Sequence, residues 1–214
     1  MTNLPVPDME ERDFLARCVG SERLEEFLAL CAKYGAFLYE TNEHLNLTAI
    51  PPSDFWTKHV CDCASILLLP ELRSAKRIAD VGCGAGLPSF PLAAALPACL
   101  VVAIDSRGKK IRFLSQAAEL CGLKNLLPVH ARANELANDP DYDRSFPIAV
   151  ARAVGAADVL RKETANLRTK NGRLYLYRTP GQAEEERRKL KCAIRLTEVF
   201  RLPHDAGERL FSIL

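Results

Sequence analysis

The chain has 214 residues, of which 48% are hydrophobic and 26% are charged. These shares are typical of a globular domain, and a core of this size buries ~70% of the surface of the unfolded chain, so fibrous and disordered proteins are excluded. The acidic start of the chain lacks the basic and apolar regions of a signal peptide, and no apolar run reaches the ~20 residues of a membrane-spanning helix. We therefore expect a cytoplasmic protein that makes no contact with membranes.

The charges are unevenly distributed along the chain, although their net value is only +2. Residues 1–60 carry five basic and ten acidic side chains, whereas residues 161–214 carry thirteen basic and seven acidic ones. A polarised chain of this kind can present a basic face to a nucleic acid, but a solvated helix over 184–191 explains much of the C-terminal excess. The eight cysteines lie within or beside apolar segments, which is typical of a reducing compartment, so we expect no disulfide framework.

The first 72 residues predict helices. Apolar side chains recur every three or four positions between residues 24 and 38, which predicts an amphipathic helix over 21–40 with Ser21 as its N-cap. After a loop over 46–53, Ser53 is placed to cap a second amphipathic helix that extends to about Leu67. We predict that residues 1–72 form a helical extension of a domain over 73–214.

From Arg77 onward, short β-branched runs alternate with helical stretches. Strands are predicted over 77–81, 99–105, 125–131, 147–154 and 172–178, and helices over 91–96, 109–120, 158–167 and 183–193. This alternation predicts an α/β fold with a mostly parallel sheet and helices on both faces. The last predicted strands, over 194–202 and 208–214, are joined by the turn PHDAG without a helix, so we expect a C-terminal antiparallel hairpin.

Three glycines, Gly82, Gly84 and Gly86, directly follow the first predicted strand. Without a Cβ, they allow positive φ and a close approach of the backbone to a ligand. Asp105 ends the next strand, where a carboxylate can accept the hydroxyls of a ribose. The spacing G-x-G-x-G, with Asp80 just ahead, differs from the G-x-G-x-x-G of dinucleotide sites, and a carboxylate there suits an ammonium better than a pyrophosphate. We therefore favour S-adenosylmethionine as the cofactor, although such a loop can also be a plain tight turn.

Seven segments carry a more specific signal. They are NLTAI at 46–50, KHVCDCAS at 58–65, DVGCGAGLPSFPLA at 80–93, DSRGKKIRFL at 105–114, HARANE at 130–135, ARAV at 151–154 and GERLFSIL at 207–214. In this order they resemble the glucose-inhibited division protein B family of small-subunit ribosomal RNA guanine-N7 methyltransferases. The resemblance implies a class I S-adenosylmethionine-dependent methyltransferase fold, which is Rossmann-like, with an N-terminal helical extension. It also implies methyl transfer to N7 of a guanine in 16S ribosomal RNA or in the small ribosomal subunit.

The resemblance also implies site residues. The cofactor-binding candidates are Gly82, Gly84, Gly86, Leu87, Asp105, Ala133, Asn134 and Arg152, and the substrate-side candidates are Asn46, Lys58, His59, Asp62, Lys109, Lys110 and Arg178. The chain departs from the family pattern at Cys63, at Ser89, where a glycine is usual, and at Arg178, where a lysine is usual. Because arginine keeps the charge of lysine but not its geometry, the departure at Arg178 bears on the substrate assignment.

The chemistry expected from the resemblance needs few special groups. Guanine N7 carries a lone pair and no proton, so we expect positioning of the reactants and no catalytic acid or base. We expect no metal, because His59, Cys61 and Cys63 lack a fourth ligand and the C-x-x-C spacing of a zinc site. The basic residues after Asp105 are as typical of a solvated helix start as of a phosphate contact.

Two other functions stay open at this point. One is an RNA-binding or ribosome-assembly factor that binds S-adenosylmethionine but has an altered target or no turnover, and the departures from the family pattern motivate it. The other, less favoured, is a nicotinamide-dependent oxidoreductase. No heptad seam requires association, so we expect a monomer.

Overall fold

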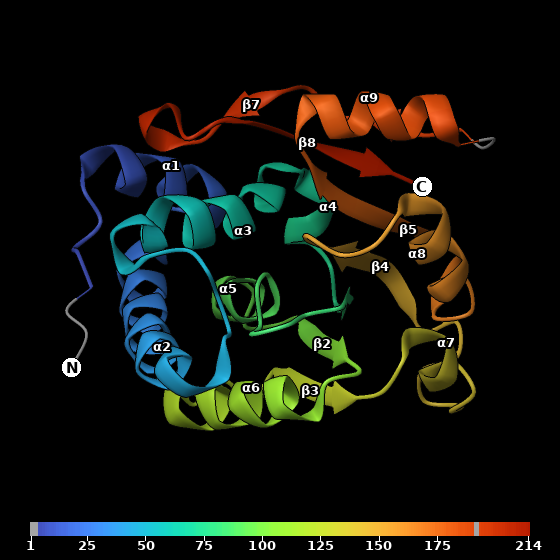
Figure 1. Ribbon diagram of the computed structural model, residues 1–214, viewed down its shortest axis with the longest axis horizontal. Helices are drawn as coiled ribbons and strands as arrows, with labels where there is room; N and C mark the ends of the chain where they lie inside the picture. The colour runs from blue at the N-terminus through green and yellow to red at the C-terminus, as the bar shows by residue number, and fades with distance from the viewer. Residues whose placement is uncertain (1–3, 191–192) are drawn as a thin grey trace.

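A central β-sheet with helices on both faces organises the computed structural model, which describes residues 4–190 and 193–214 (Figure 1). The strands are β1 (Arg77–Val81), β2 (Leu100–Asp105), β3 (Leu126–His130), β4 (Phe146–Ala151), β5 (Arg168–Arg178), β6 (Arg195–Leu196), β7 (Phe200–Arg201) and β8 (Glu208–Ile213). The α-helices are α1 (Met9–Val19), α2 (Leu24–Leu45), α3 (Asp62–Ala64), α4 (Pro70–Arg73), α5 (Ser89–Ala95), α6 (Gly108–Cys121), α7 (Ala133–Leu136), α8 (Ala157–Glu163) and α9 (Pro180–Lys189). The 3-10 helices η1 (Pro52–Asp54), η3 (Ser65–Leu68) and η4 (Pro203–Asp205) and the π-helix η2 (Phe55–Cys61) complete the described elements.

The strand order is β3-β2-β1-β4-β5-β8-β6, and β7 pairs with β8. Strands β1 to β5 pair in parallel, whereas β8 is antiparallel to β5, β6 and β7. The α/β prediction and the C-terminal hairpin are confirmed. The strand predicted over 194–202 is instead two short strands, because the Thr197 hydroxyl accepts a hydrogen bond from the Phe211 N–H at 2.9 Å and interrupts regular pairing. Part of the helix predicted over 183–193 lies outside the described residues.

The two faces of the sheet pack into separate hydrophobic clusters. In β1, Ile78 belongs to the cluster under α1, α2, α5 and α6, whereas Ala79 and Val81 belong to the cluster under α7 and α8. This alternation is expected for a strand that is buried on both sides. Figure 1 shows α1, α2 and α3 to the left of the sheet and α7 and α8 to its right.

The N-terminal helices begin at residues other than those predicted. Helix α1 begins with a capping box in which the Asp8 carboxylate accepts the Glu11 N–H and the Glu11 carboxylate accepts the Asp8 N–H. Ser21 is not an N-cap, because a turn occupies 21–23 and α2 begins at Leu24. Ser53 is not an N-cap either, since it lies inside η1.

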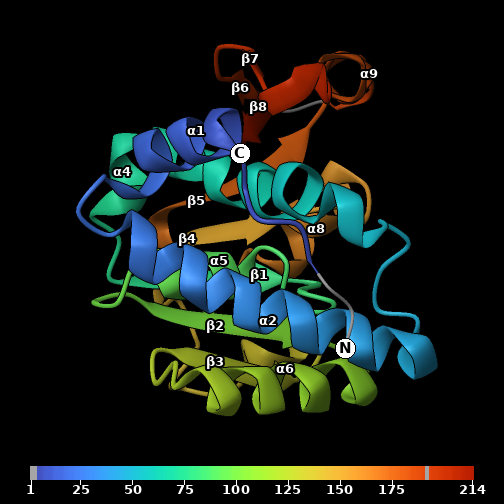
Figure 2. The same ribbon diagram turned by 90° about the vertical axis from the view of Figure 1, so that its left-hand side faces the viewer.

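Residues before and after position 72 share one hydrophobic cluster. Phe27 of α2 and Trp56 of η2 belong to the same cluster as Phe113 of α6 and Phe211 of β8. Figure 2 shows α2 and α6 side by side, and Phe37 stacks on Phe113 with ring centroids 5.1 Å apart. The helical extension therefore covers one face of the sheet and contributes to its core.

Tyr34 of α2 connects the helical extension to the glycine loop. Its hydroxyl donates to the buried carbonyl of Ala85 at 2.8 Å, and its ring stacks on Phe90 at 4.2 Å. We predict that Tyr34→Phe lowers the free energy of unfolding by about 1–3 kcal/mol, because a buried carbonyl loses its donor. Urea denaturation measures this, with Tyr142→Phe as the control, since the Tyr142 hydroxyl donates to no described residue. Equal effects of the two substitutions would contradict the prediction.

Candidate active site

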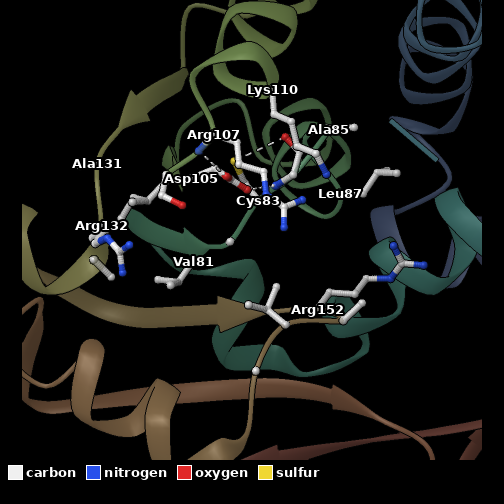
Figure 3. A pocket seen from close by; sticks show the side chains of 18 of the residues that line it. Val81, Cys83, Ala85, Leu87, Asp105, Arg107, Lys110, Ala131, Arg132 and Arg152 are labelled. Carbon is white, nitrogen blue, oxygen red and sulfur yellow. Dashed lines mark hydrogen bonds between the residues drawn. The ribbon is translucent and has the colours of Figure 1, made fainter. Parts of the chain in front are cut away.

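A cavity of about 500 Å³ lies where β1, β2 and β4 end. Its wall consists mainly of segments 81–85, 104–107, 131–133 and 152–155, which follow or end strands of the parallel sheet (Figure 3). Strand β1 pairs with β2 on one side and with β4 on the other. The chain therefore adds β2 and β3 on one side of β1 and β4 and β5 on the other, so the strand order reverses at β1. Ligands of open α/β sheets bind at this kind of position, and the volume is within the ~300–1,000 Å³ range of ligand pockets.

The glycine loop and the end of β2 are held together by the Asp105 carboxylate. One oxygen, Oδ2, accepts the Gly84 N–H at 2.9 Å, and the other, Oδ1, accepts the Arg107 N–H at 2.8 Å (Figure 3). Gly82 has a φ of +73°, and a Cβ there would lie 2.7 Å from Val154, so the first turn of the loop requires glycine. The carboxylate thus stands at the cavity with both oxygens oriented.

Six of the eight cofactor-binding candidates line the cavity. These are Gly82, Gly84, Leu87, Asp105, Ala133 and Arg152. Gly86 lies behind the loop, where a Cβ would lie 2.4 Å from the Leu114 side chain, so it serves the packing of the loop on α6. Asn134 is exposed on α7 and is not part of the wall.

Asp80 does not lie where its position in the motif suggests. It is fully buried, and its Oδ2 accepts the N–H of Ser89 at 3.0 Å and also the Ser89 hydroxyl, so it anchors the start of α5 and does not line the cavity. Its Oδ1 has no hydrogen-bond partner among the described residues. Burial raises the pKa of Asp80 to about 7, although the bonds from Ser89 act in the opposite direction.

Of the substrate-side candidates, His59 and Lys110 line the cavity. Asn46 is exposed at the C-terminus of α2, and Lys109 is exposed on α6. Lys58 forms an ion pair with Asp54 at 2.8 Å. None of these three belongs to the cavity wall.

Arg178 and Asp62 are buried in ion pairs. Arg178 pairs with Glu186 of α9 at 2.8 Å and is not part of the cavity wall, so its charge is used inside the fold. Asp62 accepts Nε of Arg152 at 2.7 Å and Nε of Arg209 at 2.9 Å. Because Arg209 belongs to β8, Asp62 joins the helical extension to two distant parts of the sheet and holds Arg152 at the cavity.

His59 is held against the loop that follows α2. Its Nε2 lies 2.8 Å from the hydroxyl of Thr48, and only 4% of the residue is exposed. Burial, assisted by the nearby charge of Arg152, lowers the pKa of His59 to about 3, so the ring is neutral at physiological pH.

The sequence interpretation missed several residues of the site. Arg132 lines the cavity, and its signal is its position shortly after the end of β3. Arg107 also lines the cavity and belongs to the basic residues after Asp105 for which the sequence left phosphate contact and a solvated helix start open. Thr48 and Arg209 lie within the quoted segments NLTAI and GERLFSIL, but their hydrogen bonds to His59 and Asp62 depend on the folded arrangement.

Solved structures of methyltransferases share this architecture. A SAM-dependent methyltransferase from Aquifex aeolicus aligns with a TM-score of 0.56 over 75% of this chain and 93% of that chain, at 16% identity. A SAM-dependent O-methyltransferase from Thermotoga maritima aligns with a TM-score of 0.55 over 82% and 70% of the two chains, at 17% identity. The fold is that of the class I S-adenosylmethionine-dependent methyltransferases, as the sequence predicts.

The comparison of sequences is more specific. The family model of rRNA small subunit methyltransferase G matches residues 28–209. A ribosomal RNA small subunit methyltransferase G from Lactobacillus delbrueckii subsp. bulgaricus is 36% identical over 187 residues, which are 83% of this chain and 78% of that protein. A protein of the same name from Geobacillus thermodenitrificans is 36% identical over 85% of this chain and 79% of its own length. The chain belongs to the rRNA small subunit methyltransferase G family, and the predicted resemblance is confirmed.

The cavity fits S-adenosylmethionine, the cofactor of this family and fold. The Asp105 oxygens can accept ribose hydroxyls, the bare backbone of the glycine loop leaves room beside them, and Arg152 offers a guanidinium to a carboxylate. The oxidoreductase alternative is not retained. In addition, no helix within the described ranges is long and apolar enough to cross a membrane.

Asp105 provides a test of the cofactor's orientation. We predict that Asp105→Ala weakens S-adenosylmethionine binding by about 1–3 kcal/mol, because the ribose hydroxyls and the Gly84 N–H lose their acceptor. Calorimetry with the purified chain measures the affinity. Asp143→Ala is the control, since that carboxylate is exposed and lies outside the cavity wall. Unchanged affinity of the Asp105 variant would show that the ribose lies elsewhere.

Asp80 provides a test of the site's electrostatics. Because its pKa is raised in the folded state to about 7, the folded chain holds a proton that the unfolded chain releases near pH 4. Stability from this group is therefore complete below about pH 4 and is lost as the pH rises through 7. We predict that the free energy of unfolding of Asp80→Asn, relative to that of the unsubstituted chain, rises by about 2–3 kcal/mol between pH 5 and 8. Urea denaturation at both pH values measures it, and a pH-independent difference would refute it.

Proposed function

We propose that this chain transfers the methyl group of S-adenosylmethionine to N7 of a guanine in 16S ribosomal RNA, free or within the small ribosomal subunit. The observation that carries the proposal is the family match over residues 28–209, which contains every residue of the cavity wall. Such a substrate implies a cytoplasmic location, where ribosomes are assembled. That the chain acts as a monomer stays a prediction.

The reaction requires no proton transfer by the protein. S-adenosylmethionine supplies a methyl group on a positively charged sulfur. The N7 lone pair forms the new C–N bond while the electrons of the C–S bond go to sulfur, so the charge moves to the guanine ring and no proton leaves. Proximity and orientation can supply ~7–11 kcal/mol of the reduction in barrier.

The ionisable groups near the cavity support this mechanism. The Asp105 carboxylate accepts two backbone N–H groups, Asp80 is bound to Ser89 beneath the loop, and His59 is neutral because its pKa is near 3. Each group is placed to orient a partner, and no free base faces the reactants from the glycine loop or from η2. A base that is unstacked from the RNA is the expected target, since side chains read single-stranded nucleotides most readily.

A basic rim borders the cavity on the side of β2 and β3 and suits an RNA backbone. It consists of Arg107 and Lys110 after β2 and Arg132 after β3 (Figure 3). Arg132 is largely exposed, and its nearest carboxylate, Glu135, is 4.0 Å away. Guanidinium groups in this setting can contact phosphates next to the target nucleotide.

A second candidate function is a ribosome-assembly factor that binds the cofactor without turnover. The ion pair between Arg178 and Glu186 supports it. At the position where a lysine is usual in the family, this chain has an arginine whose charged group is buried against Glu186 and does not line the cavity. The experiment below separates the two functions.

The proposed reaction is tested with methyl-labelled S-adenosylmethionine and small ribosomal subunits, or their RNA, that lack the modification. We expect label in 7-methylguanosine after digestion and mass spectrometry. Label in another nucleoside would replace the proposed target atom. Absence of label together with intact cofactor binding by calorimetry would favour the assembly factor.

The role of the basic rim is tested by salt dependence. We predict that Arg132→Ala lowers RNA affinity and reduces the slope of log K against log salt by about 1, because one phosphate contact is lost. Lys124→Ala is the control, since Lys124 is exposed just before β3, at the end of that strand opposite to Arg132. Equal slopes for the two variants would exclude Arg132 from the RNA interface.

A further inference from the structure

Two arginines from distant parts of the sheet share the carboxylate of Asp62. Its Oδ2 accepts Nε of Arg152 at 2.7 Å, and its Oδ1 accepts Nε of Arg209 at 2.9 Å. The Asp62 side chain is 6% exposed, so each oxygen depends on these donors. Arg152 belongs to the cavity wall, whereas Asp62 and Arg209 do not. Arg209 is thus connected to the cavity through Asp62.

The hydrogen bonds of Arg152 differ from the usual pairing of a guanidinium with a carboxylate. Such pairs are frequently bidentate, with two parallel N–H···O bonds to the two oxygens. The Nε–H and Nη2 of Arg152 lie on one side of the guanidinium and could form such a pair with Asp62. Instead, Nε donates to Oδ2 and Nη2 donates to the Lys58 carbonyl at 2.7 Å. The oxygen that would complete the bidentate pair, Oδ1, is the one that accepts Arg209.

Arg209 is fixed by its own strand. Its Nη1 donates to the Glu208 carbonyl at 3.0 Å, and β8 pairs with β5, β6 and β7. Removal of this donor would leave Oδ1 of Asp62 buried without a partner, which is costly. Rotation of the carboxylate onto both Nε and Nη2 of Arg152 would satisfy Oδ1 again. That rotation withdraws Nη2 from the Lys58 carbonyl and turns the guanidinium.

The third nitrogen of Arg152 is the one that a ligand can use. Nη1 has no hydrogen-bond partner among the described residues and is not enclosed by them. S-adenosylmethionine carries one carboxylate, at its methionine end, and its adenine, ribose and sulfonium have no negative charge. Because a guanidinium binds a carboxylate more strongly than a neutral group, the direction of Nη1 bears on cofactor affinity.

We propose that Arg209 is a positioning residue for the cofactor. By occupying Oδ1 of Asp62, it prevents bidentate pairing there and keeps Nη1 of Arg152 directed at the carboxylate of S-adenosylmethionine. The C-terminal strand thereby contributes to cofactor affinity through two side chains that lie between it and the ligand. The inference concerns cofactor binding alone, so it does not depend on which RNA atom receives the methyl group.

The test combines two substitutions at Arg209 with two ligands. Arg209→Met removes the donor but keeps an unbranched apolar stem, and Arg209→Lys keeps a charged donor. The ligands are S-adenosylmethionine and methylthioadenosine, which has the adenosine part but lacks the carboxylate. Calorimetry gives the Kd of each, and the binding stoichiometry reports the folded fraction. Arg201→Met is the matched control, because Arg201 of β7 is exposed, pairs with Glu208 at 3.4 Å and lies outside the cavity wall.

We expect Arg209→Met to weaken S-adenosylmethionine binding by about 5–20-fold and methylthioadenosine binding by less than about 2-fold, because only the first ligand has a carboxylate. Arg209→Lys should recover most of the loss, and Arg201→Met should change neither Kd. In an Arg152→Ala background, Arg209→Met should cause no further loss, since its effect passes through Arg152.

A measurement on the unsubstituted chain applies even where Arg209→Met does not fold. In nitrogen NMR spectra, the Nε–H signals of both Arg152 and Arg209 should shift more with S-adenosylmethionine than with methylthioadenosine, because the two groups share Asp62. Arg209→Lys assigns the signal of Arg209. A shift that is confined to Arg152 would contradict the proposal.

The calorimetric results can overturn the proposal in three ways. An equal loss of affinity for both ligands would give Arg209 a purely structural role. Unchanged S-adenosylmethionine binding by a folded Arg209→Met would show that Arg152 is oriented without Arg209. An undiminished effect of Arg209→Met in the Arg152→Ala background would assign it to another route. Failure of the proposed methyl transfer to RNA is distinguishable, because it leaves these binding measurements unaffected.

Discussion

The site depends on the junction between the ends of β1 and β2. The Ile104 carbonyl accepts the N–H groups of both Gly82 and Cys83, at 2.8 and 3.1 Å, and the Asp105 carboxylate accepts that of Gly84. Three successive N–H groups of the loop are thereby satisfied by two successive residues of the neighbouring strand. A loop held in this way cannot collapse into the cavity, so its surface is available to a ligand without a cost of reorganisation.

The opposite wall is built differently, around the single carboxylate of Asp62. Taking a carboxylate and two guanidinium groups out of water is costly, and removal of one partner leaves the others buried without compensation. Asp62 therefore enforces the simultaneous presence of Arg152 and Arg209, and with them of the C-terminal strand. This explains why the helical extension and the C-terminal strand, which are far apart in the chain, meet at one site. It also explains how Arg152 is held in the cavity wall.

Features that depend on neighbouring residues in the sequence could be predicted, whereas features that depend on contacts between distant residues could not. The glycine loop is predicted from the glycine spacing at 82–86, and the parallel sheet is predicted from the local alternation of strands and helices between Arg77 and Arg178. The partners of Asp80 and Arg178 are not predicted from the sequence, because an ionisable side chain at either position could equally bind a ligand. Only the fold shows that Ser89 binds Asp80 and that Glu186 binds Arg178. The capping box of helix α1 has a local sequence signal, namely Asp8 followed three residues later by Glu11. The π-helix η2 has no comparable local signal, because its side chains are held by packing between α2 and the sheet.

The arrangement of the two walls agrees with a reaction that moves charge but no proton. In acid–base catalysis a site needs a group whose pKa is close to the working pH and that is free to reach the substrate. Asp80 has a pKa near 7 but is enclosed beneath the loop, whereas His59 reaches the cavity but remains neutral down to about pH 3. Neither residue meets both conditions. Asp105 and Arg152 offer the site an acceptor and a donor that are held by hydrogen bonds, which suits a nucleophile that already carries its lone pair and requires only to be placed in line with a methyl group.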